Sequence, residues 1–168
     1  MRSLIALVVL VTVSACGVPG PASPAPTKSA TAGTAQTAAC DARIDRGVLP
    51  DWARAGFSEA EPKVAHVVGT LGEVAAILFG DPLSAPSSGD HANKILWVAR
   101  RGSATASDLE ISAQRMDGSE LVGRPVERRV PGGPGPSTID LPDAGCWRMS
   151  LRWADRTDSL DLAYQVPA

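Results

Sequence analysis

The sequence predicts an all-β protein, an antiparallel β-sandwich with one short helix, preceded by a signal peptide and a disordered linker. Three observations carry this prediction: an apolar run at the N-terminus, a stretch of small residues and Pro after it, and then a series of short strand-like segments separated by Gly, Pro, Asp and Ser. Short strands with turn residues between them at regular spacing are typical of two packed sheets. We therefore expect three parts, 1–15, 16–39 and 40–168, of which only the last builds a core.

The N-terminus has the pattern of a lipoprotein signal peptide. Arg2 supplies a positive charge, and an almost uniformly apolar run extends from Leu4 to Val13. This run is too short for a spanning helix, which needs about 20 apolar residues. The motif Val-Ser-Ala-Cys at 13–16 resembles the lipobox of bacterial lipoproteins, in which the Cys is acylated and becomes the mature N-terminus. The motif predicts lipidation of Cys16, although an ordinary secretory signal is the alternative.

Lipidation would place the protein on the extracytoplasmic face of the cell membrane, because two or three acyl chains hold a protein firmly at a bilayer. The next segment, residues 17–39, is a predicted tether. Of its 23 residues, 20 are Ala, Thr, Pro, Gly or Ser. Such a composition buries too little apolar surface to fold alone. We expect a flexible linker that lifts the folded domain away from the membrane.

The remaining cysteines, Cys40 and Cys146, form an even pair in an oxidising compartment, which predicts a disulfide. The bridge would close a loop of about a hundred residues and contribute on the order of 4 kcal/mol in the chain-entropy model. Cys146 shares a strand face with Arg148 and not with Trp147. We therefore expect the bridge at the rim or on the outer side of the sandwich, unlike the inter-sheet bridge of antibody domains.

Eight segments have strand character, and each is bounded by turn residues. They are His66–Leu71, Glu73–Phe79, Lys94–Arg100, Leu109–Met116, Val126–Val130, Thr138–Leu141, Cys146–Trp153 and Leu160–Val166. The alternation is clearest in the last two, where apolar residues occupy every second position, which indicates strands with one buried face. These residues are Trp147, Met149, Leu151, Trp153, Leu160, Leu162, Tyr164 and Val166.

The last two segments are expected to pair as a hairpin around a turn at 154–158. Apolar residues oppose apolar residues only where the two residue numbers sum to an odd value, and the expected register pairs Trp153 with Leu160. In that register Arg152 lies opposite Asp161 on the outer face of the sheet.

A short helix is expected at 50–56, because Pro50 and Asp51 favour its start and Gly56 its end. Trp52 and Phe57 would then pack onto the sheets. The alternative is that these two aromatic side chains form an exposed platform on which sugars stack.

The composition argues against several classes of function. The chain has 16 Lys and Arg against 18 Asp and Glu, so we expect no nucleic-acid partner. It has no G-x-S-x-G or H-E-x-x-H motif, and we expect no catalytic residue, no metal site and no cofactor. The enzymatic alternative is a small envelope hydrolase or metal-dependent enzyme with a loop site near Asp81, Asp90 and His91.

Three weaker patterns suggest ligands, and each has a simpler structural interpretation. Oxygen ligands for calcium are present around the last turn at Asp155, Asp158 and Asp161. Soft ligands for copper are present at Met116, Met149, His66 and His91, but Met149 belongs to the predicted core. A basic group suited to anionic wall polymer comprises Arg100, Arg101, Arg124, Arg128 and Arg129, but Glu120 and Glu127 lie among them.

Four segments resemble a family of uncharacterised actinobacterial, including mycobacterial, cell-envelope lipoproteins. They are Leu-Phe-Gly-Asp-Pro-Leu at 78–83, Asn-Lys-Ile-Leu-Trp-Val at 93–98, Gly-Pro-Ser at 135–137 and Leu-Pro-Asp-Ala-Gly-Cys-Trp-Arg at 141–148. The resemblance implies an envelope location and a sandwich, and it assigns no catalytic residue. The Gly-Cys-Trp segment is similar to the start of late strands in immunoglobulin-like domains, so we expect an immunoglobulin-like sandwich.

The expected function is a non-enzymatic binding or interaction module, held at the membrane through its lipid anchor. An envelope protein or a wall polymer is the expected partner. A purely structural lipoprotein is the remaining alternative.

Overall fold

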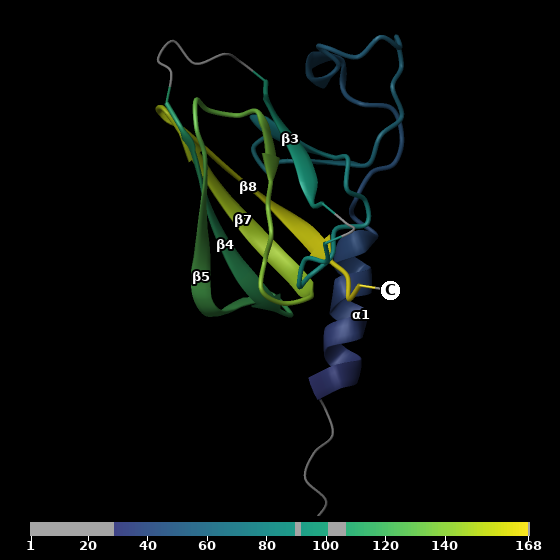
Figure 1. Cartoon of the computed structure of the whole chain (residues 1–168), viewed down its shortest axis with the longest axis vertical. Helices are drawn as coiled ribbons and strands as arrows, with labels where there is room; N and C mark the ends of the chain where they lie inside the picture. Colours follow the sequence, from purple (N-terminus) through teal and green to yellow (C-terminus); the bar gives the residue numbers. More distant parts are fainter. Residues whose placement is uncertain (1–28, 90–91, 101–106, 168) are drawn as a thin grey trace, which may run out of the picture.

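The computed structural model describes residues 29–89, 92–100 and 107–167, and it is a β-sandwich of two antiparallel four-stranded sheets (Figure 1). The strand order is β1-β2-β3-β6 in one sheet and β5-β4-β7-β8 in the other. The all-β sandwich that the sequence predicts is therefore confirmed. Cys16 and the predicted signal segment lie outside the described residues.

The elements follow one another in the order helix, short turn of 3-10 helix, and eight strands. Their bounds are α1 Ser29–Asp41, the 3-10 turn Asp51–Ala53, β1 His66–Val68, β2 Val74–Leu78, β3 Lys94–Ala99, β4 Leu109–Asp117, β5 Glu120–Val130, β6 Pro136–Thr138, β7 Gly145–Trp153 and β8 Arg156–Tyr164. β5 begins six residues earlier than predicted, because a two-residue turn joins it to β4 and pairs Asp117 with Glu120. Gly118 has a φ of 63° in this turn, which glycine adopts without steric cost.

The core lies between the two sheets and is built from the apolar faces that alternation predicts. Trp97 from one sheet and Trp153 and Met149 from the other are at most 2% exposed. Tyr164 is also fully buried, and its hydroxyl donates a 2.8 Å hydrogen bond to the Ile139 carbonyl. Burial raises the pKa of the Tyr164 phenol, so this hydroxyl remains a donor.

In the β7–β8 hairpin the numbers of paired residues sum to an odd value, as predicted, but the individual pairs differ from the predicted ones. Trp153 lies opposite Arg156, and Arg152 faces Thr157 and not Asp161. The cause is a tight turn at 154–155, which continues the strand through residues that were expected to form a loop. The outer-face Arg–Asp pair still forms, but its arginine comes from another position of β7, since Arg148 is opposite Asp161.

The tight turn places Asp158 on the inner face of β8, where its carboxylate is buried. One oxygen accepts hydrogen bonds from the backbone N–H of Leu71 and of Ser159, at 2.9 and 2.7 Å. The other accepts from Glu73 and Val74, at 2.9 and 3.2 Å. These four bonds compensate the burial of the charge and fix the β1–β2 turn against the edge of the second sheet.

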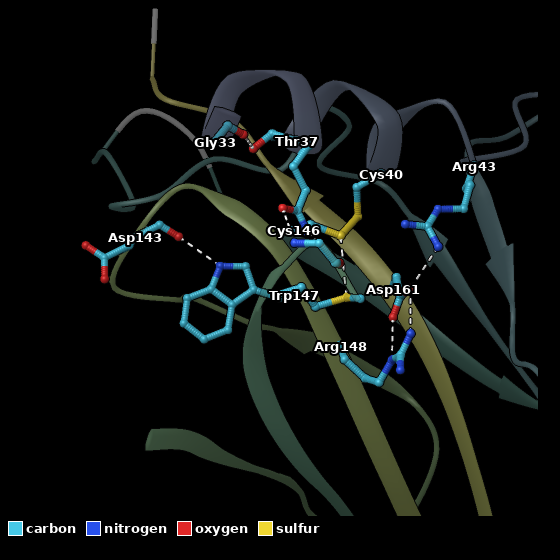
Figure 2. Close-up of a disulfide and its surroundings, with 12 residues drawn as sticks. Gly33, Thr37, Cys40, Arg43, Asp143, Cys146, Trp147, Arg148 and Asp161 are labelled. Carbon is cyan, nitrogen blue, oxygen red and sulfur yellow. Dashed lines mark hydrogen bonds and ion pairs between the residues drawn. A yellow bond between two sulfur atoms is a disulfide. The ribbon is translucent and has the colours of Figure 1, made fainter. Parts of the chain in front are cut away.

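The helix α1 corrects the prediction of a disordered linker up to residue 39. It packs beside β7 and β8, and the Cys40–Cys146 disulfide joins its last turn to β7 (Figure 2). The Gln36 side chain adds two hydrogen bonds to the backbone of Gly118, an accepted one of 2.6 Å and a donated one of 2.9 Å. As the sequence predicts, Cys146 lies on the outer face of its sheet, opposite to Trp147, and the bridge is buried where α1 packs on β7 and β8.

A second layer covers the outer face of the other sheet. The chain after α1 forms backbone bridges at Asp45–His66 and Val48–Lys63. Leu49 and Ala53 in this segment are fully buried. Ile77 is also fully buried, although it points to the opposite face of β2 from the core residues Val74, Ala76 and Leu78, so this outer face of the sheet is covered as well. The helix expected at 50–56 is shorter than predicted, because only Asp51–Ala53 takes a helical turn.

Candidate functional site

A groove of about 680 Å³ opens on the outer face of the sheet β5-β4-β7-β8. Its floor comes from Ser112, Ser150 and Ser159, which the strand register places directly opposite one another on β4, β7 and β8. Glu127 of β5 extends the row at one end, opposite Ser112. Thr70 extends it at the other end, because its backbone N–H donates a 2.8 Å hydrogen bond to the Ser159 carbonyl. We call this the serine groove.

The groove is hollow because short serine side chains lie between two rows of longer ones. The row on one side contains Glu110 and Arg152, which are paired across β4 and β7 and form an ion pair. The row on the other side contains Arg148 and Asp161, which are paired across β7 and β8 and stand beside the cavity without lining it. Outward-facing residues of neighbouring strands lie in rows across a sheet, so the difference in side-chain length produces a trough perpendicular to the strands.

The charges of Arg148 and Asp161, beside the groove, are paired within the protein. Arg148 donates to both oxygens of Asp161, at 2.8 and 3.1 Å, and Arg43 donates to the same carboxylate at 2.9 Å (Figure 2). The hydrogen bond to Asp161 raises the pKa of Arg148, so the guanidinium stays charged. At the end of the floor, Glu127 accepts a 2.8 Å hydrogen bond from the Ser112 hydroxyl.

Two hydroxyls of the groove keep their full hydrogen-bonding capacity. Within the described parts of the chain, the side chains of Ser150 and Thr157 have no hydrogen-bond partner. Both residues are exposed and both line the groove. Each hydroxyl offers one donor and two acceptor positions, so the groove presents unsatisfied hydrogen-bonding capacity on two neighbouring strands, at Ser150 of β7 and Thr157 of β8.

One exposed apolar side chain completes the lining. Leu71, in the turn between β1 and β2, is 66% exposed and lies at the edge of the groove. Its backbone is held by Asp158, as described above, so this side chain projects from a fixed position.

The three aspartates weighed as calcium ligands, Asp155, Asp158 and Asp161, are not brought together. Asp155 lies in the turn, Asp158 points inward and Asp161 outward. Across residues 29–89, 92–100 and 107–167, no group of three metal-binding side chains of His, Cys, Asp or Glu is found.

The enzymatic alternative depended on Asp81, Asp90 and His91. Asp81 is engaged by Arg46, which donates to its two oxygens at 2.9 and 3.0 Å. Asp90 and His91 lie outside the described residues, so that alternative is not tested.

The side chains weighed as soft copper ligands have other contacts. The buried Met116 sulfur lies 3.8 Å from the Cys146 sulfur, and Met149 is fully buried on β7. His66 is buried, and its Nδ1 lies 2.8 Å from the Val64 carbonyl oxygen.

The aromatic candidates for sugar stacking lie away from the groove. The Arg100 guanidinium carbon lies 5.9 Å from the centroid of the Trp52 ring, and Phe57 stacks on Phe79 with the centroids 6.2 Å apart. The stacked pair is partly open, since Phe79 is 56% exposed.

Two arginines of the basic group named from the sequence bind different partners within the protein. Arg128 donates to the Asp140 carbonyl at 2.7 and 3.2 Å, and Arg129 forms an ion pair with Asp108. Arg101 lies outside the described residues.

Sequence reasoning missed the groove. It identified the polar faces that contain Ser112 and Ser150, but it did not align them, because the alignment depends on pairing between strands far apart in the chain. The sequence did contain one indication of the groove: on both β4 and β7, a serine occupies an outward position between two longer polar side chains.

The fold and the groove together define a class of protein, a β-sandwich with a ligand-sized trough across the outer face of one sheet.

Comparison with protein-family models, curated proteins and solved structures finds no match to this chain. In the described part of the chain, no helix has both the length and the apolar character needed to cross a membrane. The resemblance to envelope lipoproteins therefore stays a prediction.

Proposed function

We propose that the protein is a lipid-anchored, non-enzymatic binding module of the cell envelope, attached through Cys16 and built on an immunoglobulin-like sandwich. The serine groove is its binding surface. The observation that supports this proposal most directly is the pair of unbonded hydroxyls on Ser150, in the groove floor, and on Thr157, opposite Arg152, beside an ion pair that is already formed. A site whose walls need no rearrangement before binding loses less entropy when a ligand is bound.

The chemistry of the lining favours binding over catalysis. The groove is lined by hydroxyls, carboxylates, one guanidinium and leucine side chains. A serine nucleophile needs a general base beside it, most often His, and the described lining contains no His.

Anchoring is compatible with the way the N-terminal part of the domain is held. α1 is fixed to the sheet by the disulfide and by Gln36, and Cys16 precedes it in the chain. A flexible tether that ends at a fixed helix would hold the domain near the membrane without requiring the sandwich itself to contact lipid.

The test uses the full chain, purified in detergent, and a filled-groove variant, Ser150→Gln. The matched control is Ser119→Gln, because Ser119 is equally exposed but lies in the β4–β5 turn. Thermal unfolding is measured with calcium, zinc, copper, solubilised wall fragments, neutral oligosaccharides, acyl lipids and a protein extract of the envelope.

We expect at least one probe to stabilise the wild type and the control but not Ser150→Gln. Ligand at about a hundred times its Kd adds roughly 2.7 kcal/mol. A panel in which no probe stabilises the protein, or in which Ser150→Gln responds as the wild type does, would contradict the proposal.

A further inference from the structure

We propose that the serine groove binds an uncharged, hydroxyl-rich chain, a segment of neutral glycan laid across the strands along the serine row. This inference rests on the proposed function and adds the chemical class of the ligand. It follows from the hydroxyls of the floor, the charge balance of the walls, the length of the row and the apolar side chain at its edge.

The floor matches the hydrogen-bonding chemistry of a sugar. A Ser or Thr hydroxyl donates one hydrogen bond and accepts two, and sugar hydroxyls have the same capacity. The exposed hydroxyls of Ser150 and Thr157 are free for such bonds, since neither is bonded to another described residue. Ser112 and Ser159 can still accept, because each uses its proton in the contacts to Glu127 and Thr70.

The charge balance favours a ligand without charge. Arg152 supplies the positive charge of the described lining, and Glu110 already engages it. A phosphate or sulfate group would have to displace Glu110 and would also approach Glu127. Like charges at short range disfavour such a complex. A metal ion meets a different obstacle, because no group of three His, Cys, Asp or Glu side chains in the described chain could hold one. Of the carboxylates in the lining, Asp158 directs both oxygens at backbone N–H groups and Glu110 is paired with Arg152.

The dimensions favour a chain over a single sugar. The row runs from Glu127 through three serines to Thr70, and it crosses the three intervals between β5, β4, β7 and β8 before it reaches the β1–β2 turn. At about 4.8 Å per interval, the part on the strands alone is roughly 14 Å long. The volume of about 680 Å³ lies within the range of ligand pockets, about 300 to 1,000 Å³.

The edge of the groove offers the apolar contact that a sugar ring also needs. One face of a pyranose ring presents mainly C–H groups, and Leu71 is exposed at the end of the row where such a face would lie. The aromatic residues Trp52 and Phe57 are not required, since neither lines the groove.

The experiment titrates the full chain in detergent with neutral glucan oligosaccharides of α and β linkage, and with a sulfated glucan as the matched anionic probe. Binding is measured by isothermal titration calorimetry at low and high NaCl. The variants are Ser150→Ala, which removes one hydroxyl, Ser150→Gln, which fills the groove, and Ser119→Ala as the control.

We expect a neutral oligosaccharide to bind, with a Kd that salt does not change, because no charge pair forms. Ser150→Ala should weaken binding about fivefold, the effect of one hydrogen bond. Ser150→Gln should weaken it by at least the same factor, and Ser119→Ala should leave it unchanged. Thermal unfolding of each variant verifies that it is folded.

Two results would overturn the inference, and they differ in what they say about the proposed function. If the groove binds the sulfated glucan, a metal ion or an envelope protein, and Ser150→Gln abolishes that binding, the ligand class is wrong and the binding function stands. If no probe binds in a manner that depends on Ser150, both are wrong.

Discussion

The buried carboxylate of Asp158 provides the sharpest test of the structure. Asp158→Asn keeps the size and shape of the side chain but replaces one acceptor oxygen with an NH₂ donor. In the structure the two oxygens accept four backbone hydrogen bonds, of 2.7 to 3.2 Å. The amide can satisfy only the pair that faces its oxygen, so the other two N–H groups face a donor.

The magnitude follows from those two groups. Each buried N–H left without an acceptor costs about 1 to 3 kcal/mol, and the remaining pair loses the benefit of a charged acceptor. Partial solvent access near the turn reduces the sum. We expect Asp158→Asn to lower the free energy of unfolding by about 3 kcal/mol, which is roughly 10 °C in Tm for a domain of this size.

The assay is chemical and thermal unfolding, combined with hydrogen exchange of the amides of Leu71, Glu73 and Val74. The control is Asp155→Asn, because Asp155 is an exposed carboxylate in the adjacent turn. We expect faster exchange at the three amides only in Asp158→Asn. If Asp158→Asn unfolds within about 0.5 kcal/mol of the wild type and the three amides remain protected, the assigned role of this carboxylate is refuted.

Three further predictions concern the disulfide, the anchor and the Asp108 carboxylate. Replacing both Cys40 and Cys146 with Ala should lower the free energy of unfolding by about 4 kcal/mol, measured by urea denaturation, and should increase hydrogen exchange in α1; unchanged stability would contradict this. Cys16→Ser should abolish incorporation of a palmitate analogue in cells, as detected by mass spectrometry, and continued labelling would exclude Cys16 as the acylated residue. The hydrogen bond from the Gly132 backbone N–H lowers the pKa of Asp108 in the folded protein. The stability that this carboxylate contributes is therefore fully present above the pKa of the unfolded state, and it is lost as the pH falls through the pKa of the folded state. Asp108→Asn should therefore reduce stability at pH 7 but not at pH 2, and an equal loss at both values would show that the charge is irrelevant.

The sequence predicts the faces of the strands well because alternation depends on neighbouring residues alone. The inward positions of β7 and the outward position of Cys146 follow directly from period-two patterning. The turn between β7 and β8 was missed because Ala154, and not Gly or Asn, occupies the position with a positive φ of 47°. That single turn decides the register, and with it the burial of Asp158.

The helix α1 was missed for a related reason. Its residues are mostly Ala and Thr, so the sequence shows no apolar stripe along one side of a helix. An isolated Ala-rich helix of this length is also only marginally stable in water. The helix packs on the sheet through the disulfide and through Gln36, two contacts to residues far along the chain. The serine groove depends in the same way on the register between strands that are distant in the chain. The alternation within each strand shows that its serine faces outward, but it does not show that the serines of different strands are aligned.

The most direct test of the central claim, that the serine groove is a ligand-binding surface with a preference for neutral glycan, is an amide NMR titration of the full chain in detergent with a neutral oligosaccharide. We predict saturable shift changes at Ser112, Ser150 and Ser159 and at Leu71, with no comparable change at Ser119. Shift changes that do not saturate, or that cluster away from this row, would contradict the claim.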